Sequence, residues 1–122
     1  MTSILVVEDD EDLLSTMMEW LAFHGHTVYG ASSGEEGLRK MMSGNFDVII
    51  LDWQLPGMAG IEVVKAYRSA GGKIPVLMLT GRRDPKEKEA CLAAGASEFL
   101  TKPFRLEQLS QQIGRVLNSP IV

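Results

Sequence analysis

Four short strand-like segments of this sequence end in polar residues that could act together in one chemical site. Glu8 and Asp9 follow the first of these segments, Asp52 follows the second, and Thr80 and Lys102 follow the third and fourth. Clustered carboxylates repel one another unless a cation lies between them, and their hard oxygen atoms suit Mg²⁺. A carboxylate beside bound Mg²⁺ can attack phosphorus and form an acyl phosphate. The residue types therefore point to phosphoryl transfer onto an aspartate.

The same set includes groups that could stabilise a phosphoryl group, whose charge is spread over three oxygen atoms. The Lys102 ammonium can pair with one oxygen, and the Thr80 hydroxyl and a nearby backbone N–H can donate to the others. Each residue also has a simpler interpretation. Glu8 and Asp9 could serve a helix N-terminus, and Asp52 could serve a turn. Lys102 could be a surface charge and Thr80 a helix cap, but the occurrence of all these residues at strand ends favours a shared site.

Length and composition limit the possible classes of protein. The chain has 122 residues, of which 45% are hydrophobic and 23% charged, as in a single globular domain. Its formal net charge of −4 provides no basic field for nucleic acid or anionic lipid. The single cysteine, Cys91, excludes an internal disulfide and fits a reducing compartment. No signal peptide is visible and no run approaches the roughly 18 apolar residues of a membrane span, so we expect a cytoplasmic protein without membrane or direct nucleic-acid contacts.

The expected secondary structure is a strand followed by a helix, repeated five times. Strands are expected at 4–7, 27–29, 48–51, 75–79 and 98–101. The run at 4–7 is continuous and apolar, as is typical of a strand covered on both faces, and the strand at 48–51 is the most apolar. Helical spacing of apolar residues gives inner faces formed by Leu13, Leu14, Met17, Met18 and Leu21, by Leu38 and Met41, by Ile61, Val64 and Tyr67, and by Leu106, Leu109, Ile113 and Val116. Ser33 and Asp84, the latter followed by Pro85, are expected N-caps. Gly25 and Gly95 are expected helix ends.

This alternation predicts an α/β fold, because strands connected through helices pair in parallel and place helices on both faces of the sheet. Right-handed crossovers favour a flavodoxin-like (βα)5 three-layer sandwich with a five-stranded parallel sheet in the order 2-1-3-4-5. Ligands of such sheets bind outside the carboxyl ends of the strands, where the strand order reverses. The polar residues follow those ends, so we expect them to share one crevice.

The ordered set of motifs resembles the receiver domains of two-component response regulators, the CheY-like family. The motifs are Ile4–Asp10, Val48–Asp52 with Leu55–Met58, Val76–Thr80, Gly95-Ala96 and Phe99–Phe104. The likeness covers essentially the whole chain, from Ile4 to about Leu117. It implies a receiver domain over residues 1–118, followed by a tail or the start of a linker at 119–122.

The resemblance also implies a role for each polar residue of the expected site. Asp52 would be the phosphoacceptor in a phosphorelay. Asp9 would bind Mg²⁺ directly and Glu8 mainly through water, while Asp52 and the Gln54 backbone carbonyl would complete the protein ligands. Lys102 would contact the phosphoryl group.

Further positions are implied to control switching and the lifetime of the phosphoryl group. Thr80 would hydrogen-bond that group and shift inward, and Gly81 would leave space beside it. Phe99 stands where the family has its switch aromatic, often Tyr, and lacks the phenolic hydroxyl. Gln54 and Arg82 would flank the path of the attacking water. The donor would be a phosphohistidine on a sensor histidine kinase or a histidine phosphotransfer protein, and the face made by the fourth helix, fifth strand and fifth helix could form a homodimer.

Two other classes of protein have related sites. A Mg²⁺-dependent phosphatase of the haloacid-dehalogenase type uses an Asp nucleophile, but it has a second Asp where this chain has Gln54, and the chain lacks room for a cap domain. A flavodoxin-like FMN-binding protein would need a phosphate-cradling loop after the first strand, where this chain has carboxylates that repel phosphate. We therefore expect a signalling phosphoacceptor and not an enzyme, with the phosphatase as the alternative. A stand-alone receiver and the N-terminal part of a longer regulator are both compatible with the sequence.

Overall fold

The computed structural model describes residues 2–81 and 85–118. Parallel strands form one sheet in the order β2-β1-β3-β4-β5, and a helix follows each strand, which confirms the expected flavodoxin-like α/β fold. The strands are β1 (Ser3–Val7), β2 (Thr27–Ala31), β3 (Val48–Asp52), β4 (Val76–Thr80) and β5 (Glu98–Thr101). The helices are α1 (Glu11–Phe23), α2 (Gly34–Ser43), α3 (Gly60–Ser69), α4 (Pro85–Ala94) and α5 (Leu106–Asn118).

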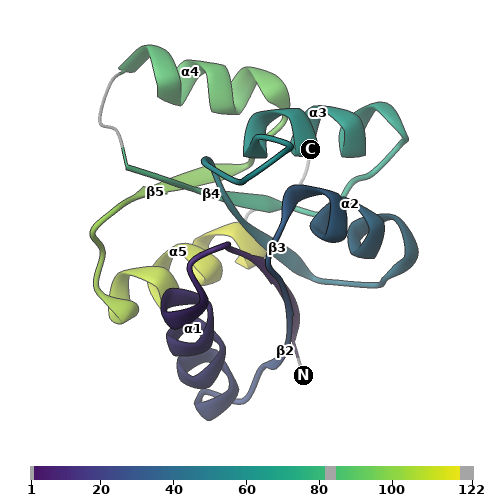
Figure 1. Ribbon diagram of the computed structural model, residues 1–122. Coiled ribbons are helices and arrows are strands. Elements are labelled where there is room, and N and C mark those ends of the chain that lie inside the picture. The colour runs from purple at the N-terminus through teal and green to yellow at the C-terminus, as the bar shows by residue number, and fades with distance from the viewer. Residues whose placement is uncertain (1, 82–84, 119–122) are drawn as a thin grey trace.

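Helices cover both faces of the sheet and enclose two apolar cores (Figure 1). α2, α3 and α4 pack on one face, where Leu51 and Met78 are fully buried. α1 and α5 pack on the other face, around Ile50 and Leu109. β3 and β4 are buried along their whole length, which explains their continuous apolar sequences. Each large apolar side chain buried in this way contributes roughly 1.5–3 kcal/mol to folding.

Side-chain caps determine where the first two helices begin. At α1, Asp10 Oδ1 accepts hydrogen bonds from the backbone N–H groups of Asp12 at 3.1 Å and Leu13 at 3.2 Å. At α2, Ser33 Oγ accepts from the Glu36 N–H at 3.2 Å, as the sequence predicted. These caps satisfy N–H groups that have no partner within the helix.

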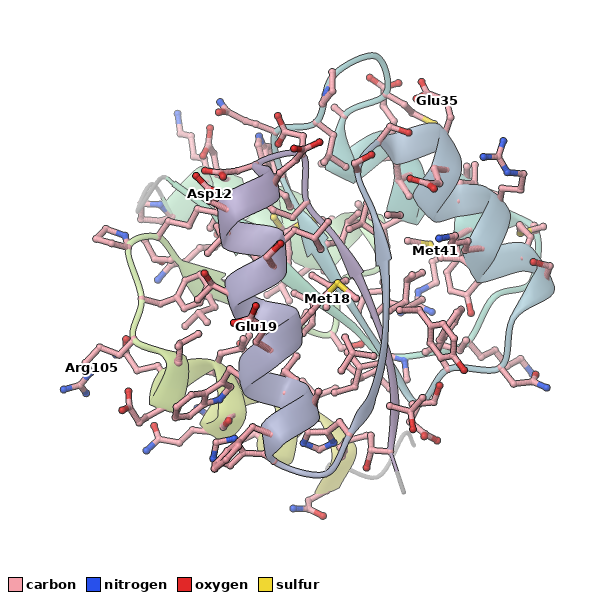
Figure 2. All side chains as sticks on the ribbon, turned by 60° about the horizontal axis from the view of Figure 1, so that its bottom comes forward. Asp12, Met18, Glu19, Glu35, Met41 and Arg105 are labelled. Carbon is pink, nitrogen blue, oxygen red and sulfur yellow. The ribbon has the colours of Figure 1, made fainter. Side chains whose placement is uncertain are left out.

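The later helices agree with the sequence in part. α4 begins at Pro85 as expected, but its expected cap, Asp84, lies outside the described residues. Before α5, the Arg105 N–H donates to Gln108 Oε1 at 2.8 Å, and the Arg105 side chain extends away from the body of the molecule (Figure 2). The glycines expected to end α1 and α4 have φ values of 89° at Gly25 and 116° at Gly95, a region that favours glycine.

Four of the five strands differ from the expectation by one or two residues at one or both ends, β2 and β4 among them. β2 continues to Ala31, which pairs with Val7 of β1 and is buried, although Gly30 made the segment look shorter in the sequence. β4 begins at Val76 because Pro75 has no N–H to donate, while the Pro75 carbonyl still accepts from the Ile49 N–H at 2.9 Å. The tail expected at 119–122 lies outside the described residues. Within the part of the chain that is described, no helix is both long enough and apolar enough to cross a membrane.

Candidate functional site

The carboxyl ends of the strands bring three of the predicted acidic residues together. β1 leads directly into Glu8 and Asp9, and β3, its neighbour in the sheet, ends with Asp52. Carboxylate oxygens of the three side chains lie within 4.8 Å of one another. The cluster occupies the point where the strand order reverses, which is the general position of ligand sites in such sheets.

The local backbone directs Glu8 into this cluster. Its N–H donates to the Ala31 carbonyl at 3.0 Å, and its Oε2 accepts from the Asp10 N–H at 3.2 Å. Because the Asp10 side chain caps α1, neither Glu8 nor Asp9 is needed as a cap. Glu8 is only 1% exposed whereas Asp9 is exposed, so the cluster has one buried side and one side open to water.

Lys102 joins the two buried carboxylates. Its Nζ donates to Glu8 Oε1 at 2.8 Å and lies 3.2 Å from Asp52 Oδ1. The Lys102 N–H donates to the Thr80 carbonyl at 2.7 Å, which holds the residue against the end of β4. With 27% of its side chain exposed, Lys102 is not the solvated surface charge of the simpler interpretation.

Burial and neighbouring charges change the acidity of two groups in the cluster. Burial raises the pKa of Glu8 above its ordinary value, and the hydrogen bond with Asp52 raises it further, against the opposing effect of Lys102. For Lys102, burial alone would lower the pKa, but its contacts with Glu8 and Asp52 outweigh burial and raise it. The contacts of Lys102 therefore favour its charged form, while burial and Asp52 disfavour the ionised form of Glu8.

The donor set of the cluster fits a hard divalent cation. Among the described residues, three carboxylates face one ammonium group here. When all of these groups are ionised, one divalent cation would balance the excess negative charge of the cluster. Mg²⁺ prefers oxygen ligands and keeps several waters, and the exposed side of Asp9 gives water access. Gln54, whose carbonyl was expected as a further ligand, follows β3 in an exposed position.

The other predicted residues differ in their exposure to solvent. Thr80 is 2% exposed at the end of β4, next to the strand that carries Asp52. Gly81 is exposed, and a Cβ at that position would meet nothing within 4 Å. Phe99 is partly buried in β5, beside β4. Arg82 lies outside the described residues.

Gly60 is a residue of the site that the sequence reasoning missed. A Cβ on Gly60 would lie 2.2 Å from the backbone oxygen of Asp52, so α3 can approach the end of β3 only because this position has no side chain. The Gly60 N–H donates to the Trp53 carbonyl at 2.9 Å, and the Trp53 N–H donates to Leu79 O at 2.7 Å. These contacts fix the backbone immediately after Asp52. The only sequence signal was a glycine at the start of a helix, where glycine is otherwise unremarkable.

The fold and the site together define a flavodoxin-like α/β domain with an acidic cluster at its topological switch point, and this cluster could hold a metal ion. Residues 4–114 match the family model described as the response regulator receiver domain. The chain belongs to this family, and so is a receiver domain of two-component signalling.

Relatives and solved structures agree with this assignment. The chain is 40% identical over 114 residues to the response regulator MprA of Mycobacterium ulcerans (strain Agy99), covering 93% of this chain and 49% of MprA. It thus spans about half the length of the curated relatives it matches. It is similar to the chemotaxis protein CheY4 of Vibrio cholerae, with a TM-score of 0.91, 38% identity, and coverage of 96% of this chain and 99% of CheY4.

A third similarity concerns a structure that contains a metal ion. The receiver domain of the sensor histidine kinase PA1611 from Pseudomonas aeruginosa PAO1 has a magnesium ion coordinated in its active site cleft. The two chains share 28% identity at a TM-score of 0.88, with coverage of 97% of this chain and 98% of the other.

Proposed function

We propose that this receiver domain accepts a phosphoryl group on Asp52 in a Mg²⁺-dependent reaction. The observation that carries the proposal is the position of Lys102 Nζ, 3.2 Å from Asp52 Oδ1 inside the acidic cluster. A lysine that contacts one carboxylate of the cluster is in place to pair with a phosphoryl oxygen once that carboxylate has been phosphorylated. The donor is a phosphohistidine of a sensor histidine kinase or of a histidine phosphotransfer protein.

The reaction transfers the phosphoryl group between two side chains. An Asp52 carboxylate oxygen attacks phosphorus, the P–N bond of the phosphohistidine breaks, and the imidazole leaves with the electron pair of that bond. Lys102 pairs with one phosphoryl oxygen and the Thr80 hydroxyl donates to another. Gly81 leaves room for the group beside the end of β4, in keeping with the open space around its Cα.

Mg²⁺ is the cation that we assign to the cluster. Asp9 and Asp52 would hold it directly, Glu8 would act mainly through water, and the Gln54 carbonyl would be the further protein ligand. When bound, the ion neutralises negative charge on the phosphoryl oxygens. Lys102, by contacting both buried carboxylates, keeps Glu8 and Asp52 close enough to act on the same ion.

Two residues are proposed to set how long the phosphoryl group survives. Gln54 and Arg82 follow Asp52 and Thr80 closely in the sequence and would flank the water that attacks the acyl phosphate. Substituting each residue by Ala and timing dephosphorylation tests this role. Unchanged rates in both variants contradict it.

Phosphorylation is proposed to change the face formed by α4, β5 and α5. Thr80 turns towards the phosphoryl group, and Phe99 moves into the volume that Thr80 leaves. The sheet register supports this coupling, because Thr80 pairs with Thr101 and Met78 pairs with Phe99, which places Thr80 and Phe99 on the same face of adjacent strands. A Thr80→Ala and Phe99→Ala double variant that, once phosphorylated, still binds its partner normally contradicts this route.

The alternative function is turnover of small phosphate esters by an Asp52 nucleophile. Such turnover requires a general acid and base near the nucleophile, and the residue two positions after Asp52 is the amide Gln54. We therefore assign a signalling role. Steady release of phosphate from para-nitrophenyl phosphate in the presence of Mg²⁺, lost in Asp52→Asn, would favour the phosphatase.

The setting in which the domain works is also a proposal. Residues 1–118 form the receiver unit, which acts in the cytoplasm with a histidine kinase or a phosphotransfer protein. Since the chain spans about half of relatives such as MprA, an output domain would lie outside the matched region. The face formed by α4, β5 and α5 is the proposed contact in a homodimer.

Intact-mass spectrometry tests the central proposal directly. The protein is incubated with acetyl phosphate and Mg²⁺, beside an Asp52→Asn variant and a sample containing EDTA. A Mg²⁺-dependent gain of one phosphoryl mass, absent in the variant, supports Asp52 as the acceptor. A gain that persists in Asp52→Asn moves the acceptor to another residue.

A further inference from the structure

Phe99, the proposed switch residue, is in contact with a lysine that the proposed phosphotransfer does not use. The Lys88 Nζ of α4 lies 4.5 Å from the centroid of the Phe99 ring. The ring also packs against the core between the sheet and α4, which includes Met78 and Cys91. Phe99 therefore has an apolar side towards the core and a face covered by a cation.

A groove borders the contact between Lys88 and Phe99. Lys88 and Phe99 line a groove of about 350 Å³ together with Leu100, Thr101, Pro103, Gln108 and Gln112. Thr80 lies on the adjacent strand, on the same face of the sheet as Phe99. In this structure the Lys88 ammonium group lies over the Phe99 ring, whereas a ring that moved inward beside Thr80 would leave the ammonium group.

We propose that Lys88 is a positioning residue that holds Phe99 in its outward position and thereby opposes activation of the domain. A contact shifts an equilibrium only when it differs between the two states, and the attraction between the Lys88 ammonium and the ring is present in one of them. Cation–π contacts at exposed sites change an equilibrium by about two- to fivefold. This inference rests on the proposed function, because activation is taken to mean occupation of the Asp52 site.

The proposal predicts that removing the charge of Lys88 changes anion affinity in the opposite direction from the loss of an ordinary surface charge. Removing a positive charge should weaken the binding of any anion to the domain slightly, through the general field. If Lys88 instead restrains Phe99, its removal should strengthen the binding of an anion that stabilises the inward ring. The two effects are opposite, so one binding measurement separates them.

The experiment measures the affinity of the domain for beryllofluoride with Mg²⁺, which mimics an acyl phosphate, through the fluorescence of Trp53 beside Asp52. Lys88→Met keeps the aliphatic stem and removes the charge, and Lys88→Arg keeps the cation. Lys65→Met, an exposed position on α3, controls for net charge. We expect Lys88→Met to bind about two- to fivefold more tightly than wild type, with Lys88→Arg close to wild type and Lys65→Met equal or weaker.

A double-variant comparison shows whether the effect passes through the ring. In a Phe99→Leu background, Lys88→Met should no longer change the affinity, because no aromatic face remains. Unchanged or weaker binding in Lys88→Met, or the same gain in the Phe99→Leu background, overturns the inference. Failure of wild type both to bind beryllofluoride and to gain a phosphoryl group from acetyl phosphate overturns the proposed function, and the inference with it.

Discussion

At the scale of single residues, the site brings buried charged side chains together in an arrangement that destabilises the folded state. Glu8 is 1% exposed and Asp52 is 5% exposed, and both contact the same Lys102 ammonium group. The raised pKa of Glu8, caused by burial and by Asp52, is a sign of that cost, because a carboxylate stabilised by its surroundings would have a lowered pKa. Functional sites are commonly destabilising in this way.

Asp52→Asn should therefore stabilise the metal-free protein, since it removes one negative charge beside buried Glu8 and keeps the side-chain volume. We expect a gain of about 1 kcal/mol in the free energy of unfolding, measured by urea denaturation in EDTA. Glu89→Gln, an exposed position on α4, is the matched control and should change stability by less than about 0.5 kcal/mol. Equal effects of the two substitutions would show that the cluster carries no such cost.

Cys91 offers a second prediction at this scale. It lies on the buried face of α4 with 1% of its surface exposed, and burial, with a smaller contribution from Glu87, raises its pKa from 9.0 to about 11. Below that pH the folded state keeps the thiol protonated, so iodoacetamide at pH 8 should modify Cys91 far more slowly in the native protein than in urea, because the thiolate is the reactive form. Mass spectrometry of timed samples measures both rates, and native labelling as fast as unfolded labelling contradicts the buried position.

At the scale of secondary structure, the sequence predicted the order and type of the helices and strands better than it predicted which residues of different elements contact one another. Apolar runs predicted β3 and β4 because both faces of these strands are covered. Ser33 predicted the start of α2 because its hydroxyl caps that helix. Capping by Asp10 and the bridging position of Lys102 depend on side-chain direction, which spacing alone does not fix. The packing of Gly60 on Asp52 brings the start of α3 against the end of β3. The sequence alone does not show which residue a glycine packs against.

Two glycine-to-alanine substitutions test the role of that close approach. In Gly60→Ala the new Cβ would lie 2.2 Å from the Asp52 backbone oxygen, so we expect a loss of about 2 kcal/mol or more in stability and slower phosphorylation, because α3 or Asp52 must shift. Gly114→Ala in α5 is the matched control, since its Cβ would meet nothing within 4 Å and alanine favours a helix by roughly 0.5–1 kcal/mol. Urea denaturation and the rate of acetyl phosphate labelling measure the two effects, and equal stability of the two variants would contradict the steric argument.

At the scale of the whole molecule, the sheet has two edge strands, β2 and β5, and β2 lies beside α1. Met18 projects from α1 towards this strand (Figure 2), and a Cβ on Gly30 would lie 2.8 Å from the Met18 sulfur. On the outer edge, Lys40 Nζ of α2 donates to the Gly30 carbonyl at 2.6 Å. An edge strand with unpaired backbone groups is a template for another chain, so Lys40 occupies an acceptor that a second molecule would otherwise use.

Replacing Lys40 by Met should therefore increase self-association while changing the stability of the monomer little, because the side chain is 40% exposed and surface pairs contribute at most about 1 kcal/mol. The loss of a positive charge makes the chain more negative, which by itself opposes association. Arg39→Met carries the same charge change at an exposed position on the same helix, so it isolates the role of the edge. Sedimentation velocity over a range of concentrations should show more dimer or larger species for Lys40→Met than for Arg39→Met or wild type. Equal sedimentation of the two variants would mean that the backbone of β2, and not the lysine at its edge, already prevents pairing.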